Sequence, residues 1–328
     1  MRIVGLIGLA LLATQDGASV PPDTLPEVLT ATIPLGLPES LADVLRAPVA
    51  EVALGRRLFF DPILSIDRTI ACASCHDPAH GMASGTALSS GVHGARTLRN
   101  APAIVNRALG ASFMWDGRVA TLEEQVLQPI ANELEMDLAL DDAVARLAAD
   151  DAYRAEFAAV FSAAPSRATL ANALASFVRR LLSGDSPVDR FRTGDIGALS
   201  QAERSGLWLY ESRGGCWRCH SGPNFTDEAF HTTGVGAQDG VPEPGRFAIT
   251  RDEADRGRFK TPTLRDVAAS APYMHDGSLA TLADVVEFYR QGGRPNSNLD
   301  AHLRPIDLSD EDAEHLVAFL RALSARRP

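Results

Sequence analysis

The spacing of apolar residues along the chain predicts a mainly α-helical protein. Apolar side chains recur at helical intervals in six stretches: residues 49–60, 141–149, 152–161, 169–182, 200–212 and 309–323. The first stretch stops before Asp61-Pro62, since proline does not continue a helix. Thr121 and Thr281 each precede acidic residues, and are the predicted N-caps of two more helices. Strand signals are confined to short pieces.

One segment of the chain occurs twice. The sequence Met-Trp-Asp-Gly-Arg-Val-Ala-Thr-Leu at 114–122 returns as Met-His-Asp-Gly-Ser-Leu-Ala-Thr-Leu at 274–282, at an offset of 160 residues that also pairs Pro102 with Pro262. A constant offset indicates a duplicated unit rather than shared helix chemistry. Residues 184–198 are rich in Gly, Asp and Pro and are the predicted linker; residues 221–258 form a long Gly-rich loop.

All four cysteines lie in two copies of one motif, at 72–76 and 216–220. Cys-x-x-Cys-His is the attachment signature of c-type haem, in which two thiols bind the porphyrin and the histidine ligates iron. A zinc site or a pair of redox dithiols is the alternative, but neither accounts for a histidine after both pairs. We therefore expect two covalent haems, held by Cys72, Cys75, Cys216 and Cys219 and ligated by His76 and His220. Each motif precedes one copy of the repeat, which predicts two cytochrome c-like haem domains in pseudo-repeat, at 21–190 and 191–328.

The composition of the chain limits its expected cellular location and the classes of partner that it could bind. The chain has 328 residues, a net charge of −11 and no run of 18 apolar residues, so no membrane span is expected. The acidic balance argues against nucleic acid and favours a basic protein partner. Residues 1–20 contain a short basic and then apolar stretch typical of a secretory signal; the alternative is a frayed N-terminal helix. Covalent haem favours the signal, and hence the periplasm.

The residue opposite each histidine decides what its haem does. Fourteen residues after Trp115 stands Pro129, which cannot ligate iron, whereas fourteen after His275 stands Tyr289, whose phenol can. This comparison favours an open first haem and a second haem ligated by His220 and Tyr289. The alternative is that Tyr289 is a core tyrosine whose hydroxyl bonds to a neighbour.

Seven motifs make the chain similar, over residues 54–323, to the bacterial dihaem cytochrome c peroxidase superfamily. They are Leu-Phe-Phe-Asp-Pro at 58–62, Cys-Ala-Ser-Cys-His-Asp-Pro at 72–78, Arg-Asn-Ala-Pro at 99–102, Trp-Asp-Gly-Arg at 115–118, Thr-Leu-Glu-Glu-Gln at 121–125, Arg-Gly-Arg-Phe-Lys-Thr-Pro at 256–262 and Pro-Tyr-Met-His-Asp-Gly at 272–277. Ordinary members carry methionine where this chain has Tyr289, so the chain resembles the MauG-like branch. A hard anionic phenolate stabilises oxidised iron and lowers its potential.

The resemblance also implies roles for residues near the first haem and between the haems. Glu135 matches the distal acid–base group, Gln125 and Pro129 share its face, and Trp115 lies between the haems. Calcium is expected at Asn100, Ser270 and Pro272, because this hard cation prefers oxygen ligands. His275 matches a position at the edge of the second haem, where a hydrogen bond to a propionate is expected.

For activity, the resemblance implies an oxidoreductase that reacts with hydrogen peroxide. A MauG-like member would form a high-valent state across both haems and oxidise a protein partner, for example a methylamine dehydrogenase precursor-like protein. The alternatives are a peroxidase fed by a small cytochrome c or cupredoxin, and a pure electron-transfer cytochrome. His93 lies near a loop histidine that caps the first iron in reductively activated members; the Gly-rich loop favours a non-ligating role. MauG-like members relay oxidation through a tryptophan before the second motif, where this chain has Gly214-Gly215, and Trp217 is the nearest candidate.

Overall fold

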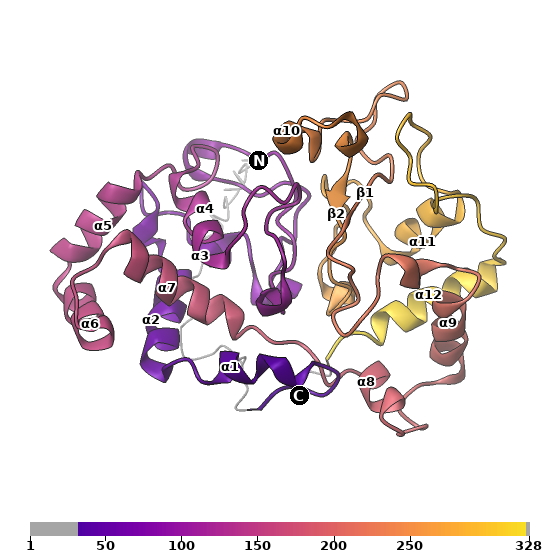
Figure 1. Cartoon of the computed structure of the whole chain (residues 1–328), viewed down its shortest axis with the longest axis horizontal. Helices are drawn as coiled ribbons and strands as arrows, with labels where there is room; N and C mark the ends of the chain where they lie inside the picture. The colour runs from indigo at the N-terminus through magenta and orange to yellow at the C-terminus, as the bar shows by residue number, and fades with distance from the viewer. Residues whose placement is uncertain (1–31, 326–328) are drawn as a thin grey trace, which may run out of the picture.

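The protein forms two helical halves that lie side by side (Figure 1). The computed structural model describes residues 32–325, so the predicted signal segment 1–20 lies outside the described residues. Its helices and strands are α1 (Ala42–Leu45), α2 (Val49–Phe60), α3 (Leu122–Gln125), α4 (Gln128–Ala131), α5 (Leu140–Ala149), α6 (Asp151–Phe161), α7 (Arg167–Arg179), α8 (Pro187–Arg192), α9 (Gln201–Glu211), β1 (Phe230–His231), α10 (Phe247–Thr250), β2 (Phe259–Lys260), α11 (Leu282–Arg290) and α12 (Asp310–Arg321). The predicted mainly helical class is confirmed.

A helix crossing organises the first half, where α2 leads towards the first haem motif and packs against α7. A Cβ atom on Gly55 would lie 1.8 Å from the carbonyl oxygen of Ala173, so only glycine permits this approach. One turn later the ring of Phe59 packs against Phe177, with 5.1 Å between centroids. The buried apolar cluster of this half contains residues between 52 and 181.

The second half repeats this crossing with α9 and α12. A Cβ atom on Gly206 would lie 2.0 Å from the carbonyl oxygen of His315. One turn later Tyr210 packs against Phe319, with 4.8 Å between ring centroids. This half has its own apolar cluster, drawn from residues between 188 and 323. Each haem motif therefore follows a helix that is fixed by a glycine and an aromatic residue.

The backbone confirms that the repeat is structural. Asn106 and Asp266, 160 residues apart, both have a φ of 56°. Met114 and Met274, at the same offset, have φ values of 67° and 73°. Left-handed backbone is uncommon for residues with a side chain, so its recurrence at equivalent positions indicates one duplicated fold.

The helix ends agree with the sequence signals. The hydroxyl of Thr121 accepts a hydrogen bond from the backbone N–H of Glu124 (3.2 Å), and Thr281 does the same for Asp284 (3.1 Å). Both predicted N-caps are thus confirmed, since a cap oxygen satisfies an N–H that the first turn leaves unpaired. Helix α2 begins and ends at the predicted residues 49 and 60.

The predicted linker at 184–198 is not simply an exposed connection. It contains α8, whose Val188 and Asp189 are buried, and the predicted boundary between residues 190 and 191 falls inside this helix. The Asp189 carboxylate pairs with the guanidinium of Arg265, and the two side chains are only 3% and 1% exposed. A distant arginine thus holds a buried helix within the segment predicted as the linker.

The long loop at 221–258 is partly ordered into short elements. It contains α10 and β1, and β1 pairs antiparallel with β2 through Phe230–Lys260 and His231–Phe259. This ribbon lies between the two halves (Figure 1). Among residues 32–325 no helix is long and apolar enough to cross a bilayer.

Candidate haem sites

The first haem motif forms a 3₁₀ turn at Cys72–Ser74 that leads into His76. The Nδ1 atom of His76 lies 3.3 Å from the carbonyl oxygen of Met82 and also approaches the carbonyl of Pro102. Burial lowers the pKa of His76 to about 4, so its imidazole is neutral. A neutral ring that is tied through Nδ1 presents Nε2 as the atom available for a metal, which is the geometry an axial ligand needs.

The predicted distal residues share one cavity with this motif. Gln125, Pro129 and Glu135 line the same cavity as Cys72, Cys75 and His76. The other walls are mainly apolar: Phe59, Ile70, Ala71, Ile104, Leu122, Val126, Met136, Leu174 and Val178, with Arg107. A hydrophobic cavity with a few convergent polar groups is typical of cofactor sites, so these residues fit a porphyrin.

Two contacts fix Glu135 in this cavity. The side-chain amide of Asn132 donates to its carboxylate (2.7 Å), and the backbone N–H of Val92 donates to its carbonyl oxygen (2.9 Å). Burial raises the pKa of Glu135, while Asn132 and Arg118 oppose that rise. A Cβ atom on Gly91 would lie 2.1 Å from the carbonyl oxygen of Leu134, so the loop reaches this segment only because residue 91 is glycine.

The loop that contains His93 does not direct this histidine into the cavity. The His93 side chain is 62% exposed, and its Nε2 atom lies 3.8 Å from a carboxylate oxygen of Asp137. His93 is absent from the residues that line the cavity. The geometry therefore supports the non-ligating role for His93.

The second haem motif repeats the arrangement of the first. It forms a 3₁₀ turn at Cys216–Arg218, and the Nδ1 atom of His220 lies 3.1 Å from the carbonyl oxygen of Phe225 and approaches that of Pro262. Burial lowers the pKa of His220 as it does in the first domain. The backbone carbonyls of Pro102 and Pro262, at equivalent positions of the repeat, thus lie near the imidazoles of His76 and His220.

Tyr289 lies on α11 beside the second pair of cysteines. Burial, followed by the nearby sulfurs of Cys219 and Cys216, raises the pKa of its phenol. Among the described residues no hydrogen bond involves the Tyr289 hydroxyl, so the alternative of a core tyrosine bonded to a neighbour finds no support. The phenol of Tyr289 and the imidazole of His220, the predicted iron ligand, come from different elements and both lie near Cys216 and Cys219.

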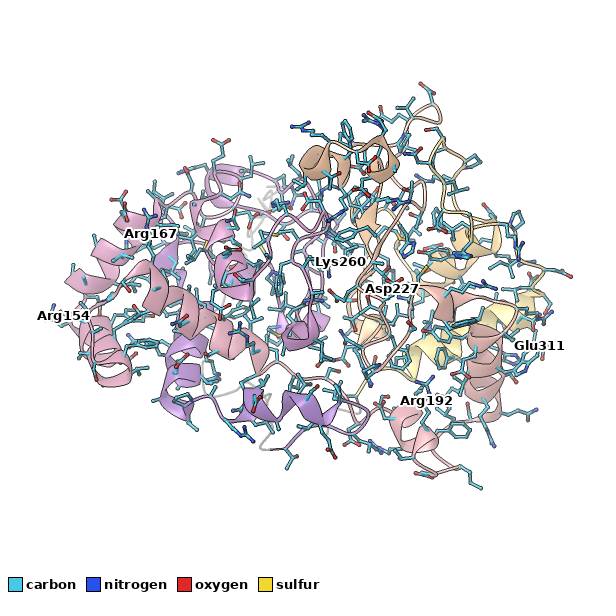
Figure 2. All side chains as sticks on the ribbon, viewed as in Figure 1. Arg154, Arg167, Arg192, Asp227, Lys260 and Glu311 are labelled. Carbon is cyan, nitrogen blue, oxygen red and sulfur yellow. The ribbon has the colours of Figure 1, made fainter. Side chains whose placement is uncertain are left out.

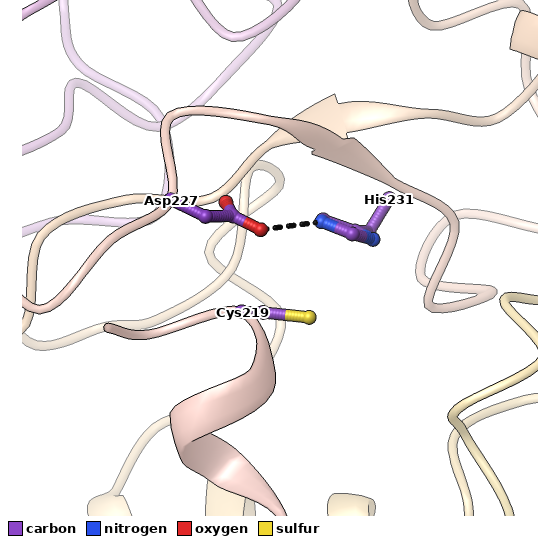
Figure 3. A group of neighbouring side chains, drawn as sticks. All are labelled: Cys219, Asp227 and His231. Carbon is purple, nitrogen blue, oxygen red and sulfur yellow. Dashed lines mark hydrogen bonds and ion pairs between the residues drawn. The ribbon is translucent and has the colours of Figure 1, made fainter. Parts of the chain in front are cut away.

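The zinc alternative is not supported by the cysteines. A four-cysteine zinc site needs all four sulfurs together, but in the described part of the chain the two cysteine pairs do not form a common cluster. Within residues 32–325 the only cluster of metal-binding groups is Cys219, Asp227 and His231 (Figure 3). Both ring nitrogens of His231 are engaged by carboxylates, at 3.0 Å from Asp227 and 2.7 Å from Asp300. That cluster is an ion-paired histidine beside a haem cysteine rather than a metal site.

Trp115, Asn100 and His275 meet between the two motifs. The indole N–H of Trp115 donates to the carbonyl oxygen of Asn100 (2.8 Å), and the N–H of Asn100 donates to the carbonyl oxygen of His275 (2.8 Å). The structure therefore brings the predicted inter-haem tryptophan and the predicted calcium ligand together. The Nε2 atom of His275 is bound to Glu243, and its ring stacks on Phe259, so this nitrogen has a partner other than the propionate that the resemblance implies.

The oxygens expected to bind calcium accept no hydrogen bond from the described residues. The amide nitrogen of Asn100 donates to Thr86 (3.0 Å) and Ala87 (3.3 Å), which leaves its Oδ1 atom as the free end. In the described part of the chain neither Oδ1 nor the carbonyl oxygens of Ser270 and Pro272 accept a hydrogen bond. Free oxygens suit a hard cation, so the residues fit calcium.

Sequence reasoning missed the residues that hold the predicted ones in place. Asn132 and Glu243 orient Glu135 and His275, yet nothing in their spacing marks them. Asn132 lies three residues before Glu135, a signal that could have suggested a local contact. Glu243 lies 32 residues from His275 and carries no such signal.

Known proteins resemble this chain along most of its length. The family model for di-haem cytochrome c peroxidase matches residues 49–197. The methylamine utilization protein MauG of Methylorubrum extorquens is 39% identical over 292 residues, which cover 88% of this chain and 82% of that protein. The cytochrome-c peroxidase IdrP2 of Denitromonas iodatirespirans is 36% identical over 98% of this chain and 91% of its own.

A solved structure agrees with these relatives. The crystal structure of a MauG-like protein associated with microbial copper homeostasis matches with a TM-score of 0.80 and 34% identity, over 92% of this chain and 95% of that one. The paired haem motifs, the duplicated backbone and the cavity at the first motif agree with this similarity. The chain belongs to the dihaem cytochrome c peroxidase superfamily, in its MauG-like branch.

Proposed function

We propose that this protein is a periplasmic enzyme of the MauG type that reacts with hydrogen peroxide at the haem of Cys72 and Cys75 and oxidises a protein partner through the haem of Cys216 and Cys219. When bound, the two haems supply the redox chemistry and the capacity for two oxidising equivalents. The observation that carries the proposal is the asymmetry of Pro129 and Tyr289, which occupy equivalent positions of the repeat. Pro129 lines the first cavity without a ligating atom, whereas Tyr289 places its phenol beside Cys216 and Cys219 of the second motif.

The residues of the first cavity can handle the protons of a peroxide. Glu135 is anchored at both its side chain and its backbone, so its carboxylate is held in place to take a proton from one peroxide oxygen and return it to the other. The raised pKa brings this group closer to the pH at which it must both accept and donate. Gln125 brings an amide to the same cavity, and most of the other walls are apolar.

A peroxidase fed by a small cytochrome c or a copper protein is the second candidate. Relatives such as IdrP2 are named cytochrome-c peroxidases, which favours it. Tyr289 argues for the first candidate, because a phenolate favours oxidised iron. A pure electron-transfer role does not explain a buried carboxylate in the first cavity.

The partner is expected at the exposed side of the second motif. Trp217 lies inside that motif, is 46% exposed and lines an open cavity of about 410 Å³ with Tyr210, His220 and Phe225. Its exposure supports Trp217 as the residue that a protein substrate, such as a methylamine dehydrogenase precursor-like protein, would meet.

Domain boundaries, secretion and calcium complete the proposal. We propose two haem domains, at 21–190 and 191–328; one apolar cluster in each half supports their number, and Val188 of α8 belongs to the cluster of the second half. Residues 1–20 would direct secretion, and calcium would lie at Asn100, Ser270 and Pro272.

Peroxide titration of the diferric protein tests the proposal. Prompt, long-lived bleaching of haem absorption without prior reduction is the expected result. A requirement for half-reduction would replace the proposal with the peroxidase, and inertness towards peroxide would replace it with an electron carrier.

A further inference from the structure

Three charged side chains meet between the two halves of the molecule. Arg107 belongs to the first half, and Glu228 and Lys260 belong to the second. Figure 2 shows Lys260 at the centre of the molecule, where the halves face each other. Arg107 also lines the cavity at the first motif, whereas Glu228 and Lys260 have no part in the sites described so far.

The three charged side chains are joined by direct contacts. The guanidinium of Arg107 binds both carboxylate oxygens of Glu228, at 2.9 Å and 3.0 Å, and the ammonium of Lys260 lies 3.4 Å from one of them. The backbone N–H of Ala111 donates to the same oxygen (3.3 Å). The three side chains are 9%, 12% and 10% exposed. Buried charges are expensive unless they are fully paired.

The pairing is incomplete by one negative charge. Two cations share Glu228, and among the described residues no other carboxylate forms an ion pair with either. Although burial alone would raise it, the hydrogen bonds from Arg107 hold the pKa of Glu228 below its usual value. Burial and the repulsion of Arg107 lower the pKa of Lys260 to about 8, which outweighs the opposing effect of Glu228. An additional anion is needed next to Lys260.

The position of Lys260 relates it to the second haem. Lys260 lies two residues before Pro262, whose carbonyl approaches the imidazole of His220. Asn100, the predicted calcium ligand, lies two residues before Pro102, whose carbonyl serves His76 in the same way. Lys260 is thus the counterpart of Asn100 in the repeat, and its backbone N–H donates to the carbonyl oxygen of Trp115 (2.8 Å). Where the first domain offers an oxygen ligand for a cation, the second supplies its own cation.

We propose that the ammonium of Lys260 binds a propionate carboxylate of the second haem, with Glu228 and Arg107 holding it in place. Each haem c carries two propionates, which are the anions that the charge balance requires. The inference goes beyond the proposed function, since it holds for a MauG-type enzyme and for a peroxidase alike. A fixed positive charge beside the porphyrin stabilises the reduced iron and raises its potential.

Spectroelectrochemical titration of Lys260→Met tests this contact in the protein with both haems attached. With the ligation that the proposed function gives, the second haem would be followed by a low-spin spectrum and the first by a high-spin spectrum. We expect the potential of the second haem to fall in Lys260→Met, with two haems retained because the thioether bonds remain. The matched control is Arg258→Met, which removes a cation two residues away whose side chain is 43% exposed; its potentials should equal those of the wild type. An unchanged second potential in Lys260→Met, a shift of the first haem alone, or equal shifts in both variants would each overturn the proposal.

A second variant covers the case in which Lys260→Met does not fold. Lys260→Arg keeps the charge but changes the donor, so the resonance Raman propionate bending band of the second haem should move while its potential stays close to that of the wild type. A band at the wild-type position would rule out the contact. Neither readout uses peroxide, so failure here is distinguishable from failure of the proposed activity.

Discussion

The indole ring of Trp115 meets the imidazole of His275 edge to face, with 6.2 Å between ring centroids and an angle of 68°. The two residues occupy the same position of the repeat, 160 residues apart, so the duplicated segments face each other across the molecule. Asn100 joins them, since it accepts from the indole of Trp115 and donates to the backbone of His275. Residues from both copies of the repeat are therefore joined directly at this point.

Replacing Trp115 by Phe should weaken this connection. The substitution keeps an aromatic ring but removes the donor to Asn100, which should lower the free energy of unfolding by about 1 kcal/mol. Chemical denaturation followed by circular dichroism measures the loss. Trp208→Phe is the matched control, because Trp208 is 60% exposed, and its free energy of unfolding should be unchanged. Equal losses in the two variants would contradict a specific role for the Trp115 hydrogen bond.

Replacing Glu135 by Gln should slow the reaction with peroxide by about 10²- to 10⁴-fold, because the isosteric amide cannot accept the proton. Stopped-flow absorbance gives the rate. Glu133→Gln, two residues earlier and exposed, is the matched control and should react like the wild type. If Glu133→Gln were the slow variant, the assignment of the acid–base group would be wrong by two residues.

The pH profile provides a second readout for Glu135. Since burial raises its pKa above the ordinary 4.5, the wild-type rate should decline with falling pH sooner than an exposed glutamate would allow. The carboxylate is the active base, so activity is present above its pKa and lost below it. Glu135→Gln should lack this acid limb.

Replacing Tyr289 by His should keep both haems attached and abolish oxidation of the partner. Histidine offers a ligand from the same helix, but it lacks the anionic phenolate that favours oxidised iron. The second haem should show an upward shift in potential and an altered low-spin EPR signal. Unchanged spectra and unchanged partner oxidation would show that the phenol does not ligate iron.

Calcium should be present in one copy per chain and should depend on Asn100. Metal analysis after gel filtration measures it, and incubation with a chelator should remove it together with fast electron exchange between the haems. Re-addition of calcium should restore the exchange. Asn100→Asp should retain the metal because it keeps a side-chain oxygen, whereas Asn100→Ala should lose it. A metal-free wild-type protein would refute the site.

Replacing Arg265 by Met should destabilise the protein by about 3–5 kcal/mol, since it leaves the carboxylate of Asp189 buried and unpaired. Thermal and chemical unfolding measure the change. Arg192→Met, on the same helix α8, removes one member of a half-exposed pair with Glu211 and should cost less than about 1 kcal/mol. Similar costs for the two would mean that α8 is not anchored through Arg265.

Local sequence signals predicted most helices, because apolar periodicity and capping residues act over a few positions. The Gly-Asp-Pro-rich stretch at 184–198 was predicted as a linker, without the helix that it contains. Its Ser-Pro-x-Asp at 186–189 is compatible both with a turn and with the start of a helix. What makes α8 a buried helix is Arg265, 76 residues away in the chain, and such a contact leaves no mark in local composition.

The helix crossings show a second reason for incomplete prediction. Gly55 with Phe59 and Gly206 with Tyr210 are equivalent in structure, yet they lie 151 residues apart rather than 160. An insertion between the helix and the repeat in one half shifts the register, so a search at constant offset overlooks the match. The cavity at the first motif was foreseen through resemblance, whereas the charge cluster of Arg107, Glu228 and Lys260 depends on both halves meeting.

The close approach at Gly91 connects the loop that contains His93 to the segment that positions Glu135. Because the loop touches the carbonyl of Leu134 and holds Glu135 by its backbone, a mutation on that outer loop would shift the carboxylate without altering any residue of the cavity. Substitutions in this loop could thus change the rate of turnover, in evolution or by protein engineering, while every residue that lines the cavity stays the same.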